Sequence, residues 1–308
     1  MDFSNFKIAP PDRGIENEKI VLLKDYLEKG YCVGQICKIL DIEYNKATWV
    51  IKKEELVVKN INQYYNHNED YFDNIDTEEK AYILGFIIAD GSIEVTERVN
   101  EDSKRLVFLN SVDDLEVIKL IKEEISPNSK LFFRNNQSGV KVRKEQVNLK
   151  INSRRICNTL INKYKIIPNK THDHSFNFDF NLLPKELIRH FIRGYFDGDG
   201  SVSFHKNKGS QIFFNFSFVF NSKIFTEQIA NIFQELFDIK PVIYEHAGKT
   251  CNYFLLRFDY NRNRTIKIGE IYEYLYEGSK CFLVRKKIKF EQYFGYRANS
   301  TSKQWRIV

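Results

Sequence analysis

The sequence predicts an α+β protein made of two pseudo-symmetric αββαββα repeats with antiparallel sheets, preceded by a small N-terminal helical domain. A run of apolar residues that contains a glycine and ends in Asp-Gly-Ser occurs twice, at residues 83–92 and 192–201. Each copy is followed by the same order of strand and helix patterns, with the strands grouped in hairpins, which favours antiparallel sheets. Residues 16–55 instead show the spacing of short amphipathic helices. We therefore expect a helical domain at 1–56, a polar linker at 57–76, a first repeat at 77–180 and a second repeat with a basic tail at 181–308.

The N-terminal domain is predicted to contain three short helices. The first, at about residues 17–29, has apolar positions at helical spacing and stops at Gly30. A turn separates a second helix at 33–40 from a third at 45–54, and this spacing is typical of a helix-turn-helix. In that interpretation the third helix presents polar and basic side chains to a DNA groove, namely Asn45, Lys46, Thr48 and Lys52. An ordinary helical bundle is the alternative, because acidic and basic residues balance in this domain.

Two polar segments flank the repeats. Residues 57–76 are interpreted as a linker, or as an arm that follows a DNA backbone. Residues 280–308 hold eight basic side chains and one acidic one, which accounts for the net charge of +6. This tail either keeps the protein soluble or contacts phosphates, and phosphate contact would show as a steep loss of affinity with salt.

The two repeats match element by element. In the first, the motif helix precedes strands near 92–98 and 104–111, a helix at 113–125, strands near 129–134 and 140–152, and a helix at 154–165. In the second, the motif helix from Pro184 precedes strands near 201–206 and 211–220, a helix at 222–237, strands near 241–246 and 252–260, and a helix at 264–276.

The repeated motif predicts two helices in close contact. Gly85 and Gly194 each lie five residues before an aspartate, Asp90 or Asp199. A glycine inside a helix costs about 1 kcal/mol relative to alanine, so its presence here indicates close backbone approach. If the helices pair in parallel, the two aspartates meet where the helix dipoles add negative potential. A cation relieves this repulsion, so the pair is a candidate divalent-metal site.

Alternation along the predicted strands indicates which sheet face is polar. In residues 147–152 apolar side chains alternate with polar ones, so this strand has a core face and a polar face. Lys, Arg and Asn on the polar face suit the edges of guanine and adenine in the major groove, although a merely solvated face is the alternative. The candidate DNA-binding residues are Lys141, Arg143, Asn148, Lys150 and Asn152 in the first repeat, and Asn215, Ser217, Arg257 and Tyr253 in the second, where they are expected to be exposed.

Composition narrows the class of protein. The chain has 308 residues, of which 43% are hydrophobic and 29% charged, and no apolar run reaches the roughly 18 residues that a membrane span needs. Its first residues do not form a secretory signal. The five cysteines lack the paired spacing of a zinc site and are interpreted as buried thiols. We expect an intracellular protein, in the cytoplasm, at the nucleoid or in an organelle, with no membrane partner.

From about residue 76 to 308 the doubled motif resembles the LAGLIDADG homing endonucleases, in their single-chain form with two motifs. The resemblance implies saddle-like sheets, motif helices at the interface between half-domains, and a last acidic residue of each motif that binds Mg²⁺ beside the scissile phosphates. Those residues are Asp90 and Asp199. Mn²⁺ or Ca²⁺ are the expected substitutes. The first motif departs from the pattern at Ile88, where the family often has an aspartate, whereas the second keeps Asp197.

The resemblance also implies the remaining site residues. The backbone carbonyls of Ala89 and Gly198 are expected to complete the metal coordination. Homing enzymes of this kind place a basic residue near each site, and residues 167–171 resemble the family's lysine-threonine segment, which points to Lys170. Aligning the last helix of each repeat points loosely to Lys280, for which a plain surface lysine is the alternative.

Together these features predict a monomeric endonuclease that uses Mg²⁺ to make a double-strand break at one long DNA site. Two alternatives stay open. One is a non-cleaving DNA-binding regulator on the same fold, and the other is a maturase that binds intron RNA.

Overall fold

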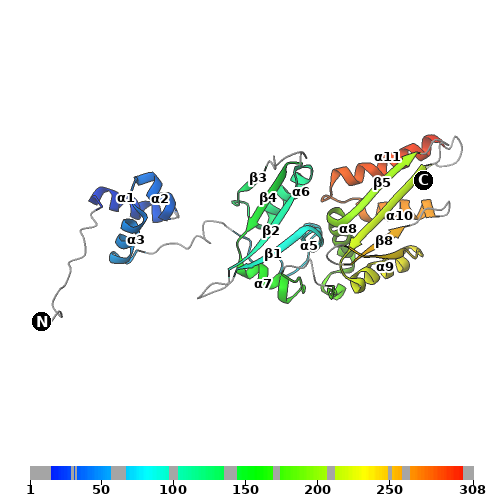
Figure 1. The fold of residues 1–308 in the computed structure, drawn as a ribbon, viewed down its shortest axis with the longest axis horizontal. Helices are drawn as coiled ribbons and strands as arrows, with labels where there is room; N and C mark the ends of the chain where they lie inside the picture. Colours follow the sequence, from blue (N-terminus) through cyan, green and yellow to red (C-terminus); the bar gives the residue numbers. More distant parts are fainter. Residues whose placement is uncertain are drawn as a thin grey trace. The chain divides into compact units, whose positions relative to one another are not determined.

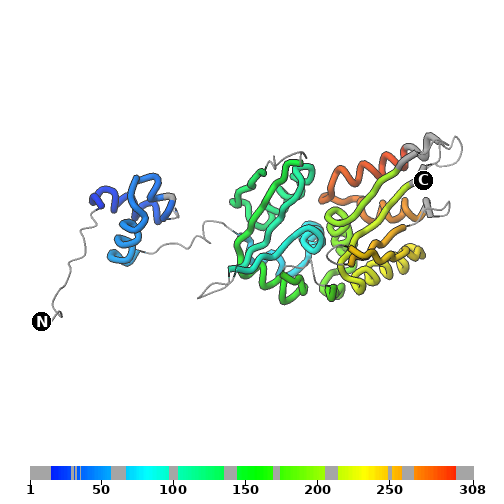
Figure 2. The backbone as a smooth tube through the Cα atoms, viewed as in Figure 1, coloured from blue at the N-terminus to red at the C-terminus, as the bar shows by residue number. Residues whose placement is uncertain are grey.

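The computed structural model describes most of the chain, and Figure 2 draws the described backbone in colour. The described residues are 15–28, 31, 33–56, 67–96, 103–134, 144–168, 174–206, 212–248, 252–258 and 264–300. The chain divides into two compact units, Met1–His67 and Asn68–Val308. None of the helices in these described stretches has the length and apolar character needed to cross a membrane.

The first unit contains three helices around a small apolar core. They are α1 (Asn17–Glu28), α2 (Val33–Leu40) and α3 (Tyr44–Lys53), close to the predicted bounds. Leu23, Ile36 and Ala47, one from each helix, are fully buried. Between α2 and α3 the chain turns sharply at Asp41, whose φ is 50°, and the N–H of Ile42 donates to the carbonyl of Cys37 at 3.0 Å. This left-handed residue ends α2 and starts the short turn.

The second unit contains two copies of one topology, each beginning with a motif helix. The first copy has α5 (Glu78–Asp90), β1 (Gly91–Thr96), β2 (Ser103–Ser111), α6 (Leu115–Ile125), β3 (Leu131–Arg134), β4 (Gln146–Ile151) and α7 (Arg154–Asn162). The second has α8 (Ile188–Asp199), β5 (Gly200–Lys206), β6 (Ile212–Phe220), α9 (Lys223–Phe237), β7 (Val242–His246), β8 (Tyr253–Phe258) and α10 (Arg264–Tyr276), followed by α11 (Val284–Ser300). The antiparallel sheets have the equivalent orders β1-β2-β4-β3 and β5-β6-β8-β7. The predicted α+β class with two equivalent repeats is confirmed.

The motif helices lie side by side between the two sheets (Figure 1). Thr77 caps the start of α5, since its side chain accepts from the N–H of Lys80. All residues of α5 from Ala81 to Ala89 are buried. A helix that is apolar on every side must pack on every side, so α5 and α8 form the centre of this unit.

Strand register separates a core face from an outer face in each sheet. In the first sheet Phe108 pairs with Gly91 and Leu149, and Phe108 and Leu149 are fully buried beneath the helices. In the second sheet Phe218 pairs with Gly200 and Leu256 in the same way. The alternate residues point to the outer face, as predicted.

Two segments differ from their predicted character. Of the predicted linker, residues 57–66 lie outside the described part, while 68–76 belong to the second unit, where Tyr71 and Phe72 are buried at 2% and 0% exposure. The predicted basic tail includes α11, which packs against β5. Phe290 and Tyr293 are fully buried, so one side of this basic helix is part of the core.

Candidate active site at the ends of the motif helices

The glycines of the two motifs place the motif helices in backbone contact. A Cβ atom added to Gly85 would lie 2.0 Å from the carbonyl oxygen of Phe191, and one added to Gly194 would lie 1.9 Å from that of Tyr82. Only glycine permits this approach. Because residue numbers rise in the same direction on both sides of the contact, α5 and α8 run parallel.

The parallel arrangement brings the two motif aspartates to the same end of the helix pair. A Cβ atom on Gly198 would lie 2.3 Å from the Cβ of Ala89 and 3.4 Å from the Cγ of Asp90, so the Asp90 carboxyl lies against the residue before Asp199. Burial raises the pKa of the Tyr195 hydroxyl well above its ordinary value, and the charges of Asp199 and Asp90 raise it further. Both carboxylates therefore act on one buried hydroxyl.

Asn110 at the end of β2 holds Asp90. Its Nδ2 donates to Oδ2 of Asp90 at 2.8 Å, and the Asn110 side chain is buried. Its Oδ1 is also buried and has no hydrogen-bond partner among the residues that the structure describes. The strand register makes Phe220 the equivalent residue of the second repeat, so the two aspartates are held differently.

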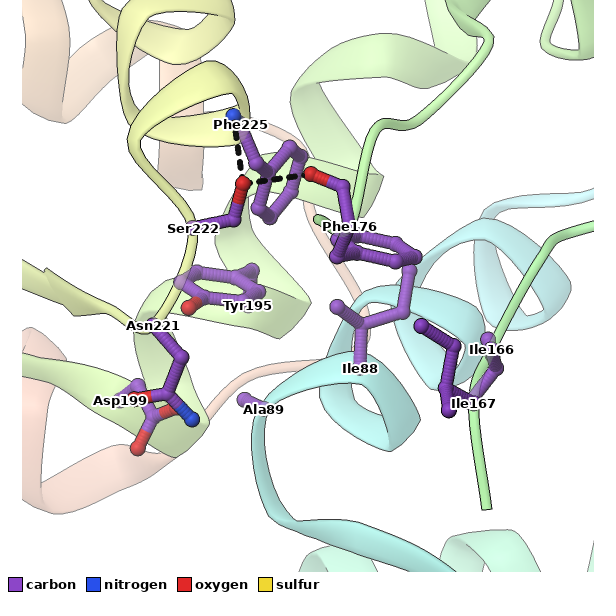
Figure 3. Close-up of a pocket in the computed structure, with 10 residues that line it drawn as sticks. All are labelled: Ile88, Ala89, Ile166, Ile167, Phe176, Tyr195, Asp199, Asn221, Ser222 and Phe225. Carbon is purple, nitrogen blue, oxygen red and sulfur yellow. Dashed lines mark hydrogen bonds between the residues drawn. The ribbon is translucent and has the colours of Figure 1, made fainter. Parts of the chain in front are cut away.

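A pocket lies beside Asp199 (Figure 3). Asp199, Asn221 and Ala89 line one end, and Phe176 and Phe225 line the other. The pocket combines residues of both repeats, so it lies on the interface that the motif helices form.

Lys286 of α11 caps the end of α8. Its Nζ lies within hydrogen-bonding distance of the carbonyl oxygens of Phe196 (2.5 Å), Asp197 (2.7 Å), Gly198 (3.3 Å) and Gly200 (2.7 Å), so one of its three N–H groups is shared between two acceptors. Burial lowers the pKa of Lys286 to about 8, although the charge of Asp197 opposes this effect. The last carbonyls of a helix lack partners within the helix, and this ammonium group supplies donors to them.

Asp197 is the centre of a buried polar network. It accepts hydrogen bonds from the hydroxyls of Tyr82 at 2.8 Å and Tyr276 at 3.3 Å, and from the N–H of Leu283 at 2.7 Å. Burial raises the pKa of this carboxyl to about 6. Asp197 therefore joins α8 to α5 and to the segment before α11, which is a structural role.

Lys280 lies at the opposite end of the motif helices from the aspartates. Its backbone N–H donates to Oε1 of Glu78 at 2.7 Å, and Glu78 is the first residue of α5. The rise per residue of an α-helix places Asp90 about 18 Å further along. The structure thus does not bring Lys280 to the aspartates, and Lys170, the other predicted lysine, lies outside the described residues.

The predicted DNA-facing residues are exposed to different degrees. Asn152 and Arg257 are exposed, and Lys150, Asn215 and Tyr253 are partly exposed, while Lys141 and Arg143 lie outside the described residues. Asn148 and Ser217 lie on the outer faces but are only 4% and 3% exposed, so the expected exposure of Ser217 is wrong. Alternation assigns a side chain to a face, but its neighbours decide whether it is covered.

Two apolar side chains on the outer face of the first sheet were not predicted. Leu109 and Phe132 pair with Asn148 from either side and are 45% and 53% exposed. The exposure of large apolar groups on a sheet face is more informative than the exposure of polar ones. The run Leu131-Phe-Phe133 lacks alternation between apolar and polar residues, so its faces could not be assigned from the sequence.

The predicted recognition helix α3 presents part of its predicted set. Asn45 and Lys52 are exposed. Lys46 lies 3.7 Å from a carboxylate oxygen of Glu43. The hydroxyl of Thr48 donates to the carbonyls of Tyr44 and Asn45, both at 3.0 Å, so it is engaged with its own helix.

The donor set at the aspartates fits Mg²⁺. Among the residues that the structure describes, no three His, Cys, Asp or Glu side chains form a metal cluster. Mg²⁺ does not require one, because it keeps several waters and binds through one or two carboxylates together with substrate phosphates. Asp90 and Asp199 would supply the carboxylates to such an ion, and the carbonyls of Ala89 and Gly198 would be the adjacent backbone oxygens. The Gly198 carbonyl makes the longest of the four Lys286 contacts.

Comparison with known proteins finds one family model and several similar solved structures. Residues 186–275 match the model of the LAGLIDADG-like domain family, which confirms the predicted resemblance for the second repeat. The chain is similar to the LAGLIDADG homing endonuclease I-GzeII in complex with its DNA target, with 13% identity over 73% of this chain and 92% of that chain, at a TM-score of 0.46. It is also similar to I-LtrWI bound to target DNA, with 14% identity over 76% of this chain and 92% of that chain, at a TM-score of 0.45. A third similar structure is I-DmoI in complex with DNA and Ca, with 16% identity over 63% of this chain and 87% of that chain, at a TM-score of 0.39. No curated protein sequence matches the chain.

Proposed function

We propose that this chain is a homing endonuclease that makes a metal-dependent double-strand break at a specific DNA site. The observation that carries the proposal is the delivery of one carboxylate from each repeat to the same end of a parallel helix pair. The two strands of a duplex are related by two-fold symmetry, and two pseudo-symmetric half-sites suit two phosphodiester bonds. Because both half-sites come from one chain, the proposed active form is a monomer.

Phosphodiester hydrolysis needs an activated water, neutralised charge at the phosphate and a stabilised leaving oxygen. In this proposal Asp90 and Asp199 hold Mg²⁺, for which Mn²⁺ or Ca²⁺ substitute, beside the carbonyls of Ala89 and Gly198. The bound metal supplies Lewis acidity and lowers the pKa of its water. Asn110 orients the Asp90 carboxylate by its 2.8 Å hydrogen bond. Lys170 is the proposed basic residue of the first half. We leave Lys280 out of this proposal, because its backbone N–H donates to Glu78 at the first turn of α5.

The outer faces of the two sheets form the proposed DNA-binding surface. Lys150, Asn215 and Arg257 offer hydrogen-bond donors there. A bidentate pairing of such a side chain with a base is worth about 1–3 kcal/mol of discrimination against the wrong base. Leu109 and Phe132 add apolar area that suits thymine methyl groups. Specificity would therefore come from both polar and apolar contacts.

The N-terminal helices form a proposed second DNA-binding module. Asn45 and Lys52 are exposed on α3, the second helix of a helix-turn-helix arrangement. Such a module would lengthen the site that the protein recognises. Its contribution is measurable as the change in salt dependence of DNA binding when residues 1–56 are removed.

The test is cleavage of a DNA library prepared from the genomic surroundings of the reading frame. The purified chain with Mg²⁺ should produce linear double-strand breaks at one site. Asp90→Asn and Asp199→Asn should each bind that site but cut it at least about 100-fold more slowly, since removing one electrostatic stabiliser from an active site costs this much. Glu227→Gln, the same chemical change at an exposed position of α9, is the matched control and should cut normally.

Other outcomes identify the two alternative functions. Specific binding of duplex DNA without cleavage in Mg²⁺ or Mn²⁺ would indicate a DNA-binding regulator. Tighter binding of intron RNA than of any duplex would indicate a maturase. Cleavage by Asp90→Asn at the wild-type rate would contradict the proposed role of this aspartate.

A further inference from the structure

We propose that Arg285 and Lys286, adjacent residues at the start of α11, are positioning residues that set the placement of Asp199 relative to Asp90 and so coordinate the two strand cuts. This inference rests on the proposed endonuclease function. It concerns residues that hold the backbone around Asp199 and the strand end next to Asp90.

Lys286 fixes the backbone that leads into and out of Asp199. Its four acceptors are carbonyls of residues 196, 197, 198 and 200, which surround Asp199 on both sides. Its side chain is 3% exposed, and its Nζ lies 5.0 Å from the ring centroid of Phe196. An ammonium group with this many short contacts is held in one position, and it holds the turn from α8 into β5 with it.

Arg285 connects the same helix to the first repeat. Its Nε donates to Oδ1 of Asp114 at 2.6 Å and its Nη2 to Oδ2 at 3.1 Å. Asp114 follows the end of β2 and is 5% exposed. A two-point contact of a guanidinium with a carboxylate fixes direction as well as distance. The second repeat is therefore fixed to the strand end of the first.

The strand end that Arg285 reaches is also the one that holds Asp90. Asn110, on β2, donates to Asp90, and Asp114 lies four residues beyond Asn110. A continuous series of hydrogen bonds and short chain segments thus runs from Asp90 through Asn110, Asp114 and α11 to the turn that carries Asp199. Each of its two ends supports one aspartate.

Lys286 lies on the buried, apolar side of α11, so its side chain also contributes to packing. The positions three and four residues apart on this side of α11 are Lys286, Phe290 and Tyr293, and the two aromatic residues are fully buried. Removing the buried ammonium group leaves its carbonyl partners without this donor, whereas an apolar side chain of similar volume keeps the packing. Methionine would pack beside Phe196 but donate nothing to the four carbonyls. The structure therefore separates a positioning role from a packing role.

The experiment measures cleavage of each strand separately, with the two strands of the target carrying different labels. Lys286→Met should slow one strand at least about tenfold more than the other. Asn110→Leu, which releases Asp90 instead, should slow the opposite strand by a similar factor. Lys119→Met, the same change at an exposed position of α6, is the control and should leave both rates unchanged. Target binding in EDTA should change less than about twofold in all three variants, because no base-contacting residue is altered.

Arg285→Met provides the second variant, at a side chain that is 41% exposed. It should make nicked intermediate accumulate, because the two halves are no longer fixed to each other. Equal slowing of both strands by Lys286→Met, or no slowing, would overturn the proposal, as would the absence of nicked intermediate with Arg285→Met. Failure of the wild-type chain to cut any DNA would instead contradict the endonuclease function itself.

Discussion

Replacing Gly194 by alanine should separate the motif helices and destabilise the second unit. The added Cβ would lie 1.9 Å from the carbonyl oxygen of Tyr82, 2.8 Å from its carbonyl carbon and 3.1 Å from the backbone nitrogen of Phe86. All three atoms are backbone, so no side-chain rotation relieves the overlap, and the helices must move apart by about 1 Å to restore ordinary contacts.

Two opposing effects set the change in the free energy of unfolding caused by Gly194→Ala. Alanine gains up to about 1 kcal/mol of helix propensity over glycine. Overpacking a close-packed interior costs about 1–3 kcal/mol, and here it also loosens contacts along the whole helix pair. The expected net loss is about 2 kcal/mol, which corresponds to a lowering of the unfolding temperature by about 4–8 °C for a unit of this size.

The assay is thermal unfolding of the second unit, compared with Gly269→Ala as the matched control. Gly269 lies inside α10, and a Cβ atom there would meet no atom within 4 Å. The control should therefore gain up to about 1 kcal/mol from helix propensity alone. An unfolding temperature of Gly194→Ala equal to or above that of the wild type would refute the close packing of α5 against α8.

Three further predictions concern stability and recognition. Burial lowers the pKa of His190 to about 4, so between about pH 6.5 and pH 4 the unfolded chain binds a proton that the folded chain does not. The stability of the wild type should therefore fall as the pH falls through this range. His190→Gln should remove this part of the fall in the denaturant midpoint, and an unchanged pH profile of the midpoint would contradict the prediction. Asp197 acts in the opposite direction, because its folded pKa of about 6 exceeds the unfolded value, so the stability of Asp197→Asn relative to wild type should decrease as pH falls from 6 to 4. Phe132→Ala should reduce the preference for thymine over uracil at one or two target positions by about 1 kcal/mol in competition binding, and equal preference in both proteins would exclude a methyl contact.

The sequence predicted the motif helices well because their signals are local. Glycine five residues before an aspartate, in two copies, indicates both the close contact and the end at which the carboxylates meet, and the structure shows that contact at Gly85 and Gly194. Strand positions were also predictable, since alternation repeats every two residues. The parallel pairing of the helices was also predictable, because both repeats begin with the same motif helix.

Contacts between distant residues were not predictable in this way. Asn110 reaches Asp90 only because the hairpin of β1 and β2 folds back, and Asn110 itself carries no pattern that marks it. Lys286 was counted among the charges of a basic tail, whereas the structure buries it among carbonyls. A charge count gives no information about burial. The spacing of Phe290 and Tyr293 from Lys286 is the signal that predicts a helix with one buried side.

The alignment that pointed to Lys280 failed for a related reason. It matched the last helices of the two repeats by position, but the segment after α10 runs back to the first turn of α5, where Glu78 accepts from the N–H groups of Lys280 and Cys281. Lys280 therefore occupies the expected place in the sequence of the second repeat but not the expected place in space. Similarly, Tyr71 and Phe72 are too few to form a periodic pattern, yet both enter the core.

The central claim is that Asp90 and Asp199 form one divalent-metal site between the two repeats. The most direct test is anomalous scattering from Mn²⁺ in crystals of the chain bound to its target DNA. We expect a peak within bonding distance, about 2.1 Å, of a carboxylate oxygen from each aspartate and of a phosphate oxygen. A peak bound elsewhere, or none at the ends of α5 and α8 in a crystal that contains the DNA, would contradict the claim.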